Sequence, residues 1–383
     1  MRVLIDYRPA LRNRTGVGEF IHNLITALSE ISSLGNPPTE LLEITAFSSS
    51  WKDRLQHNHG LPESIRTIDR KIPVNLLNLA WHRVNWPPVE LLAGTDFDVV
   101  HSPHPLLLPT RSAASVITIH DLDFLDHSYR TKNEVRRDYS SLVKRHAQKA
   151  DQVVVPSRYT AMEVERRLEV PADMISLCWN GAPDWSPRSQ LPDNGHLLFV
   201  GTLAPRKNVT GLLDAYELLL SSQKDVPDLV MVGTNPDELE LRTRLQRPSL
   251  TGRVRCPGYV DSSTLKALYT DALVLVMPSF DEGFGLPVLE AMTIGVPVVS
   301  SNRGALPEVL GKAGLFIDPL NAVDLADTIN RILTDSALMM QCIASGIEQA
   351  RLFTWQASAE ALCGAYQKAI AVRNDKCLRK TTI

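Results

Sequence analysis

Paired cysteines, long hydrophobic runs and an excess of one charge are all missing from this sequence. Its five cysteines stand singly with no Cys-x-x-Cys pair, so neither a disulfide framework nor a zinc site is indicated. The 40 Lys and Arg against 43 Asp and Glu leave a net charge of -3, which gives no broad basic surface for nucleic acid. No apolar run approaches the roughly 18–20 residues that span a bilayer, and the first residues lack the apolar stretch of a signal peptide. We therefore expect a cytoplasmic protein with no nucleic-acid partner.

What is present is an ordinary globular composition with an alternating pattern. Apolar residues make up 44% and charged residues 22%, and a length of 383 residues fits two domains better than one. Short β-branched apolar runs alternate with stretches of helical period in each half, which indicates parallel sheets covered by helices. The expected fold class is α/β, with two doubly wound Rossmann-like domains facing a cleft. Strands are expected at residues 3–5, 44–47, 98–101, 116–119 and 153–155, and again at 197–200, 229–232, 273–277, 297–299 and 315–317.

The two halves are separated by residues 181–195, which are rich in Pro, Gly and polar residues and have no periodicity. This composition is typical of a linker. We place the N-terminal domain at residues 1–183 and the C-terminal domain at 184–354. The basic residues of the segment 373–383 are expected to form a frayed tail.

The most specific string covers residues 278–292 and directly follows an expected strand. Its glycines, Gly283 and Gly285, permit a tight loop whose backbone N–H groups can face an anion, and the helix that begins next adds its positive dipole end. Such a loop suits a diphosphate. Glu282 and Glu290 flank the loop, and a carboxylate accepts hydrogen bonds from the paired hydroxyls of a ribose or another sugar.

A pair of cations, Arg206 and Lys207, follows the glycine that ends another expected strand. Two adjacent cations there can neutralise a diphosphate, Arg through a bidentate fork and Lys as a point charge. In the first half, Gly16 and Gly18 lie between a strand and its helix. The third glycine of the dinucleotide fingerprint is missing, because position 21 is Ile21, and this argues against a nicotinamide-dependent oxidoreductase.

The Glu282-x7-Glu290 pair and its Gly-Phe-Gly-Leu-Pro core resemble the signature of the retaining glycosyltransferases of family 4, whose fold is the two-lobed GT-B arrangement. The resemblance covers most of the chain. It implies that residues 355–383 form a helix that crosses back and completes the N-terminal domain. Other segments that carry the resemblance are residues 200–208, 232–233, 258–260 and 304–309.

The resemblance implies a role for each matched residue. Arg206 and Lys207 would hold the donor diphosphate. Glu282 would orient the donor sugar, Glu290 would hold the ribose, and His120 would lie beside the sugar near the reacting carbon. The implied catalytic residues are therefore His120, Glu282, Arg206 and Lys207. The implied donor-binding residues are Gly16, Gly18, Thr202, Arg206, Lys207, Val260, Glu282, Gly283, Phe284, Gly285, Leu286 and Glu290. Thr202 departs from the pattern, since many members carry an arginine directly after this strand glycine.

The pair Asp121-x-Asp123 superficially matches the Asp-x-Asp of metal-dependent sugar transferases. We expect no metal and no other cofactor, because the cation pair and the helix end already compensate the diphosphate charge. Nine of the ten histidines precede residue 150, so titratable chemistry is expected to concentrate in the first half. Among them, His101 and His104 follow an expected strand and are further candidates for the acceptor side.

The resemblance implies a hexosyltransferase that moves a sugar from a nucleoside diphosphate sugar to an acceptor hydroxyl with retention at the anomeric carbon. The sequence resembles most the bacterial enzymes that build O-antigen and related polysaccharides, which implies GDP-mannose as donor and a glycan or lipid-linked acceptor. Three alternatives stay open. They are a UDP-sugar-dependent glucosyl- or N-acetylglucosaminyltransferase, a nucleotide-sugar epimerase and a non-catalytic sugar-nucleotide-binding protein.

Two segments can be interpreted either as membrane contacts or as ordinary packed or solvated residues. Residues 81–87 couple aromatics to a cation, and residues 136–145 carry basic side chains along an expected helix. Both suit an anionic bilayer or a lipid-linked acceptor, and both equally suit packed aromatics and a solvated helix. A peripheral contact with the cytoplasmic face of the inner membrane is therefore one expectation, and no oligomeric state is predicted.

Overall fold

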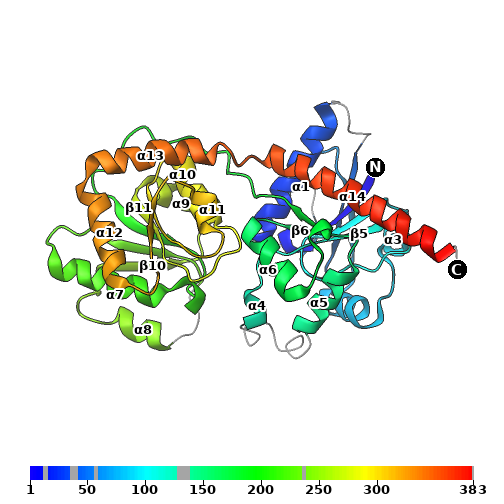
Figure 1. Cartoon of the computed structure of the whole chain (residues 1–383), viewed down its shortest axis with the longest axis horizontal. Coiled ribbons are helices and arrows are strands. Elements are labelled where there is room, and N and C mark those ends of the chain that lie inside the picture. Colours follow the sequence, from blue (N-terminus) through cyan, green and yellow to red (C-terminus); the bar gives the residue numbers. More distant parts are fainter. Residues whose placement is uncertain (12–15, 35–41, 56–58, 127–138, 235–238, 382–383) are drawn as a thin grey trace. The chain divides into compact units, whose positions relative to one another are not determined.

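The chain forms two compact α/β units (Figure 1). Unit 1 comprises Met1–Gly181 together with Thr354–Ile383, and unit 2 comprises Ala182–Phe353. The boundaries expected from the sequence, after residues 183 and 354, lie two residues and one residue further along. The computed structural model describes residues 1–11, 16–34, 42–55, 59–126, 139–234 and 239–381.

Unit 1 is built on a parallel sheet of seven strands in the order β3-β2-β1-β4-β5-β6-β7. The strand order reverses between β1 and β4, which lie side by side. Ligands of open α/β sheets bind outside the carboxyl ends of the strands at such a point. The strands are β1 Arg2–Asp6, β2 Glu43–Ser49, β3 Arg66–Arg70, β4 Val99–Ser102, β5 Ala114–Thr118, β6 Gln152–Val155 and β7 Ile175–Leu177.

Unit 2 repeats this arrangement with six parallel strands in the order β10-β9-β8-β11-β12-β13. Its order reverses between β8 and β11. The strands are β8 His196–Val200, β9 Leu229–Val232, β10 Val254–Gly258, β11 Ala272–Met277, β12 Val298–Ser301 and β13 Leu315–Ile317. The two expected parallel α/β domains are confirmed.

Helices connect the strands of both sheets. In α1, apolar residues at three- and four-residue spacing form one stripe that is buried in the core of unit 1, namely Phe20, Ile21, Leu24, Ile25 and Leu28. The helices of unit 1 are α1 Val17–Leu34, α2 Val74–Leu79, α3 Val89–Ala93, α4 Asp123–Asp126, α5 Tyr139–Lys149, α6 Arg158–Leu168 and α14 Trp355–Thr381. Those of unit 2 are α7 Val209–Ser222, α8 Leu239–Leu245, α9 Ser262–Thr270, α10 Leu286–Ile294, α11 Leu306–Leu310, α12 Ala322–Thr334 and α13 Ser336–Ala350.

Within the described residues, all ten strands expected from the sequence are present, and three further strands, β3, β7 and β10, were not predicted. Each of the three lies at the edge of its sheet. An edge strand is covered less completely than a central one, so it does not need a continuous apolar run. In β10, for example, Arg255, Cys256 and Pro257 are exposed.

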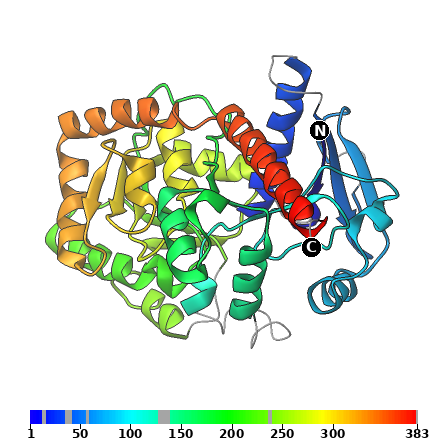
Figure 2. The same cartoon turned by 45° about the vertical axis from the view of Figure 1, so that its right-hand side comes forward.

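The expectation of a frayed tail over residues 373–383 is wrong, because α14 continues to Thr381. Lys376 Nζ forms an ion pair with the buried Asp151 at 2.8 Å. Arg373 donates hydrogen bonds to the carbonyl oxygens of Arg111 and Ser112. These contacts hold the last turns of α14 on unit 1, where the helix also packs beside α1 (Figure 2).

The segment expected to be a linker has no helix or strand over residues 182–195, yet it packs on unit 2. The backbone N–H of Arg188 donates to the carbonyl of Ile294 at 2.9 Å, and its guanidinium donates to the carbonyl of Thr270 at 3.2 Å. The chain therefore crosses into unit 2 as an ordered segment.

Two strand ends of unit 2 approach each other at glycines. Gly233 follows β9 with φ of +144°, and a Cβ added there would lie 1.9 Å from the carbonyl oxygen of Gly201, which follows β8. No side chain fits between two backbones at that separation. Gly233 therefore fixes the spacing of the loops at this edge of the sheet.

We expect Gly233→Ala to lower the free energy of unfolding of unit 2 by about 3 kcal/mol or more, since it combines backbone strain with a clash against a carbonyl. Urea unfolding monitored by circular dichroism measures this loss. Gly364→Ala is the matched control, because a Cβ at Gly364 meets nothing within 4 Å. If the two variants unfold at the same urea concentration, the close approach at Gly233 does not constrain the fold.

Candidate active site

Two loops of unit 2 meet where its strand order reverses. One follows β8 and contains the 3-10 turn Pro205–Lys207, and the other follows β11 and contains Glu282. The backbone N–H of Phe280 donates to the carbonyl of Arg206 at 2.8 Å and so ties the two loops together. The structure thus brings the cation pair and the glutamate loop, about 75 residues apart in the chain, to one place.

Glu282 is the centre of a buried ion cluster. Its Oε1 accepts hydrogen bonds from Lys207 Nζ and from Ser279 Oγ, the latter at 2.8 Å. Its Oε2 lies 3.4 Å from Nη1 of Arg206, which also donates to the carbonyl of Asp281. The side chains of Glu282 and Lys207 are only 7% and 8% exposed. A carboxylate buried in this way needs charged partners, and here it has two.

The cation pair keeps Glu282 ionised. Burial by itself raises the pKa of a carboxyl group, because water stabilises the charged form. The positive charges of Lys207 and Arg206, together with the hydrogen bonds from Lys207 and Ser279, outweigh burial and hold the pKa of Glu282 below its ordinary value of 4.5. The carboxylate is therefore negative at neutral pH.

Asn208 fixes the turn that presents Lys207. It adopts a left-handed backbone with φ of 53° and caps α7, its Oδ1 accepting from the N–H of Gly211 at 3.2 Å. Its Nδ2 donates to the carbonyl of Pro319 at 2.7 Å. Asparagine tolerates this conformation because its short side chain bonds locally.

The amino end of α10 carries no side-chain cap. Its N-cap is Gly285 with φ of 108°, a conformation that glycine adopts without strain. Gly283 and Phe284 are buried just before it, and the half-buried Leu286 begins the helix. With no capping side chain, the positive end of the helix dipole is left for an anion.

A neighbouring loop closes on the backbone of Glu282. The N–H of Ala305 donates to the carbonyl of Glu282 at 2.9 Å. Gly304, with φ of +60°, comes so close that a Cβ there would lie 2.7 Å from the backbone N and O of Glu282. Ser301 Oγ, at the end of β12, donates to the carbonyl of Ser279 at 2.6 Å. These contacts give a physical reason for the glycine at position 304.

Glu290 lies in the second turn of α10 and has a different surrounding. Its Oε2 accepts a hydrogen bond at 2.7 Å from the hydroxyl of Tyr269, which is buried on α9. Burial, and next the charge of Glu290, raise the pKa of Tyr269 well above 10. The hydroxyl therefore stays protonated and orients the carboxylate. Tyr269 was missed in the sequence, where a tyrosine on a helix gives no signal of such a role.

Two further implied donor residues lie at the same edge of the sheet. Thr202 is exposed and follows β8 after Gly201. Val260 is half-buried, follows β10 and precedes Asp261, which caps α9. Because all strands of the sheet are parallel, the segments after β8 and β10 share its carboxyl edge with Lys207.

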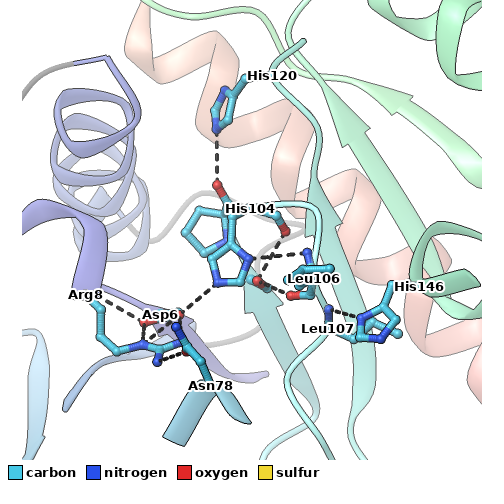
Figure 3. A network of polar contacts seen from close by, with 10 residues as sticks. Asp6, Arg8, Asn78, His104, Leu106, Leu107, His120 and His146 are labelled. Atoms are coloured by element: carbon cyan, nitrogen blue, oxygen red, sulfur yellow. Dashed lines mark hydrogen bonds and ion pairs between the residues drawn. The ribbon is translucent and has the colours of Figure 1, made fainter. Parts of the chain in front are cut away.

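In unit 1 the structure places His120 two residues after β5. Its Nε2 lies 3.2 Å from the carbonyl of Pro103 (Figure 3), and its ring meets Phe20 of α1 edge to face at 4.9 Å. The N–H of Phe20 bonds the carbonyl of Gly16, which has φ of +47°. Gly18 lies in the first turn of α1, so it belongs to the helix and not to a loop. Residues 12–15 before it are outside the described residues.

The protonation of His120 follows from these contacts. Burial lowers the pKa of its ring and outweighs the carbonyl of Pro103 and the charge of Asp121, which raise it. A carbonyl oxygen only accepts hydrogen bonds, so Nε2 carries the proton and Nδ1 the lone pair. His120 is therefore a neutral ring of defined tautomer at neutral pH.

The prediction that His101 lines the acceptor side is wrong. His101 is fully buried inside β4, and its two ring nitrogens bond the hydroxyls of Tyr366 and Thr118 at 2.9 and 2.8 Å. Burial, with nearby positive charge, lowers the pKa of His101 and His82 to about 3 and that of His146 to about 4. These histidines are neutral structural groups, so an abundance of histidine does not mark a concentration of titratable chemistry.

An ion pair that was missed in the sequence lies where the strand order of unit 1 reverses (Figure 3). Asp6 ends β1, is fully buried and accepts hydrogen bonds from Arg8, the shortest at 2.6 Å. Nε2 of His104, which follows β4, lies 3.4 Å from the same carboxylate. Arg8 also donates to Asn78 at 2.9 Å and lies over the ring of Trp81 at 4.7 Å. The signal was an Asp-x-Arg that begins at the last residue of an apolar strand.

The Asp-x-Asp pair forms a local turn, in which Asp121 Oδ1 accepts from the N–H of Asp123 at 3.3 Å. Within the described ranges, no three His, Cys, Asp or Glu side chains gather as a metal site would require. Of the basic segment 136–145, residues 136–138 lie outside the described residues and the others belong to α5.

Two Rossmann-like units of this kind define the GT-B class of glycosyltransferase folds, and sequence families divide the chain at the same place. Residues 15–184 match the family described as Glycosyltransferase Family 4, and residues 183–349 match Glycosyl transferases group 1. O-antigen chain mannosyltransferase B of Escherichia coli is 31% identical over 96% of this chain and 100% of its own length. The chain belongs to the family 4 glycosyltransferases and is a glycosyltransferase.

Another relative is also a mannosyltransferase by name, and solved structures share the fold. MMP alpha-(1->4)-mannosyltransferase of Mycolicibacterium hassiacum is 28% identical and 73% of each chain is covered. Sucrose-phosphate synthase from Thermosynechococcus elongatus has the same fold, with a TM-score of 0.75 at 21% identity over 97% of this chain and 99% of its own. WaaG, a glycosyltransferase of lipopolysaccharide biosynthesis, has a TM-score of 0.69 at 16% identity, with 94% and 98% covered.

No helix in the described part of the chain is both long enough and apolar enough to cross a membrane.

The ion cluster predicts a specific pH dependence for Glu282→Gln. At pH 7 we expect the variant to be about 3 kcal/mol less stable, because the buried cations lose their counter-charge. The pKa of Glu282 is lowered in the folded state, so its contribution is complete above the unfolded pKa and is lost as pH falls through the folded pKa. The gap to the parent chain should therefore be constant above about pH 5 and shrink below 4.5.

Urea unfolding at intervals between about pH 3 and pH 7 measures this gap. Ser279→Ala is the matched comparison, since it removes a neutral hydrogen bond to the same carboxylate. A gap for Glu282→Gln that does not change with pH would contradict the ionised state of Glu282.

Proposed function

We propose that this chain transfers mannose from GDP-mannose to a hydroxyl of a glycan or lipid-linked acceptor in the synthesis of an O-antigen-like surface polysaccharide, with retention at the anomeric carbon. The observation that carries the proposal is the buried cluster of Lys207, Arg206 and Glu282 beside the uncapped amino end of α10. The mannosyltransferase names of the relatives from Escherichia coli and Mycolicibacterium hassiacum support the choice of sugar.

The cluster suits a diphosphate leaving group. Lys207 and Arg206 are already held in place by Glu282, so an incoming diphosphate meets positioned cations and loses little to their reorganisation. The amino end of α10 adds the partial positive charge of the helix dipole. Developing negative charge on the departing oxygen is thereby stabilised.

The two glutamates bind different parts of the donor. Glu282, on the loop beside the cations, accepts hydrogen bonds from hydroxyls of the donor sugar. Glu290, oriented by the hydroxyl of Tyr269, accepts from the ribose diol. In this way the two glutamates contact one extended nucleotide sugar at two points.

A same-face substitution needs no covalent nucleophile. The bond from the anomeric carbon to the diphosphate oxygen breaks, the acceptor oxygen bonds to that carbon from the same face, and its proton passes to the departing diphosphate. The neutral ring of His120 contacts the sugar near the reacting carbon without adding a second charge. Exclusion of water protects the oxocarbenium-like centre from hydrolysis.

The reaction is proposed to proceed without a metal, because Lys207, Arg206 and the end of α10 take the charge-neutralising role that a divalent ion has in other sugar transferases. With excess EDTA, the rate of transfer should be unchanged. Loss of activity that added magnesium or manganese restores would overturn this part of the proposal.

A panel of GDP, UDP, dTDP and ADP sugars tests the donor. We expect GDP-mannose to give the largest rise in melting temperature and the fastest transfer to glycan acceptors, since binding to the native state stabilises it. A UDP-sugar as best donor, the activity of the alternative glucosyl- or N-acetylglucosaminyltransferase, would replace GDP-mannose. Binding without turnover on any acceptor would favour a sugar-nucleotide-binding protein, and sugar isomers in a donor-only incubation would indicate an epimerase.

Glu290→Ala tests the ribose contact. Hydrogen bonds to a charged group are worth about 1.5–3 kcal/mol, so nucleotide affinity should fall about ten- to a hundredfold while the fold is kept. Isothermal titration with GDP measures the change. Glu348→Ala, on an exposed part of α13, is the matched control. Equal affinities for the two variants would remove Glu290 from the donor site.

Proton NMR of the first product tests the stereochemistry. The one-bond C1–H1 coupling at the new anomeric centre, which differs between the two configurations of mannose although the H1–H2 coupling is small in both, should match that of the donor. A product of opposite configuration would rule out the same-face mechanism and leave the transferase assignment intact.

A further inference from the structure

We propose that unit 1 carries a docking surface for an anionic lipid bilayer, formed by Leu76, Leu79, Val84 and Trp86 and the cations around them. These four apolar side chains are 59%, 59%, 69% and 60% exposed and belong to one short stretch of chain. An exposed group of large apolar side chains rimmed by polar residues is typical of an interaction site.

The stretch is amphipathic. Helix α2 runs from Val74 to Leu79 and continues directly into a π-helical turn, Ala80–Val84. Leu77 and Trp81, four residues apart, are buried in the core, whereas Leu76 and Leu79, three residues apart, are exposed. Residues at these spacings share a helix face, so one face packs on unit 1 and the other presents apolar side chains outward.

The charges within residues 70–89, which carry this face, are all positive. Arg70, Lys71 and Arg83 are exposed, and residues 70–89 include no Asp or Glu. Lys52, beside Trp51, is also exposed, and the half-buried Asp53 follows it. Asp69, just before this range, is paired with Arg54 at 2.9 Å. Apolar side chains flanked by cations match an anionic headgroup layer above an acyl region.

The exposed tryptophans are a second feature that indicates a bilayer-binding surface. The chain has six tryptophans, and those that are exposed, Trp51 at 69% and Trp86 at 60%, both belong to this part of unit 1. The N–H of Ser50, the residue before Trp51, donates to the carbonyl of Arg70 at 3.1 Å, so Trp51 follows a backbone contact with one of the flanking cations. Tryptophan is enriched at the membrane interface, where its ring meets both acyl chains and headgroups.

Buried contacts hold the surface in place from beneath. Arg8, clamped by Asp6, donates to Asn78 and lies over the ring of Trp81, as the labelled residues Arg8, Asp6 and Asn78 in Figure 3 show in part. The indole N–H of Trp81 donates to the carbonyl of Pro87 at 2.9 Å. The exposed face is therefore preformed, and docking does not require the segment to fold.

A second copy of the chain fits this surface less well than a bilayer does. A two-fold interface would set the cations of one copy against those of the other, which disfavours it. The surface also follows β3 in the parallel sheet whose β5 leads to His120, so both lie at its carboxyl edge. If the proposed function holds, docking brings a lipid-linked acceptor to that edge.

The test is sedimentation of the full-length protein with vesicles, without any sugar donor. We expect binding to vesicles of phosphatidylethanolamine with phosphatidylglycerol and much weaker binding to phosphatidylcholine alone. Trp86→Glu and Leu79→Glu should each weaken binding at least about tenfold, because each loses apolar insertion and adds repulsion. Lys71→Gln should weaken it about fivefold, and added salt should weaken the parent protein in the same way.

Leu320→Glu and Leu352→Glu are matched controls, since these leucines of unit 2 are 75% and 66% exposed and lie outside the surface. They should bind as the parent chain does. All variants should keep the thermal shift that GDP gives, because its proposed site is in unit 2, so failure here is separate from failure of the proposed function. Binding unchanged in Trp86→Glu and Leu79→Glu would overturn the proposal. So would a dimer in sedimentation velocity that Leu79→Glu dissolves, which would assign the face to a second copy.

Discussion

The ion pairs of the buried Glu282 carboxylate with Lys207 and Arg206 are the interactions on which the organisation of unit 2 depends. Burial alone would drive this group toward its neutral form, and the two cations, together with the hydrogen bond from Ser279, keep it charged. They come from the loop after β8, whereas Glu282 comes from the loop after β11, so the pairing also sets the spacing of the loops. The close approach of Gly304 to the backbone of Glu282 and the hydrogen bond from Ser279 to its carboxylate also hold Glu282 in this position. The same contacts of Glu282 thus stabilise unit 2 and hold the two cations in place for the proposed diphosphate.

Unit 1 also has a buried carboxylate where its strand order reverses, and different residues surround it. Asp6 ends β1 and His104 follows β4, so its buried carboxylate also bridges the two strands between which the strand order reverses. Loops diverge at such a point, and the contact of a buried carboxylate with a side chain of the other loop joins them. Through Arg8 and Asn78 the network reaches the surface segment after β3, and the loop that holds His104 also contacts His120 through Pro103. Each unit therefore has a buried carboxylate at the point where its strand order reverses.

The central strands and the motifs were predictable because each depends on a local pattern. Continuous apolar runs occur where both faces of a strand are covered, and edge strands such as β10 lack them. The tail after residue 372 looked frayed because its anchor, Asp151, lies far away in the sequence. In the sequence, His101 and His120 look alike, since each comes at the end of a short apolar strand. In the structure, His101 is a core residue with both ring nitrogens hydrogen-bonded, whereas His120 lies at the carboxyl edge of the sheet.

The sequence by itself determined the α/β class, the two-domain division and the residue types at the donor motif, because strand runs, glycines and charged pairs act through near neighbours. Only the tertiary structure decided which charges meet. Lys207 reaches Glu282, Tyr269 orients Glu290 and Asp6 holds Arg8 and His104, and apart from the Asp6–Arg8 contact each of these joins segments far apart in the chain. The physical reason is that burial makes an unpaired charge costly, so the partner is chosen by the packing of the sheets and not by position along the sequence.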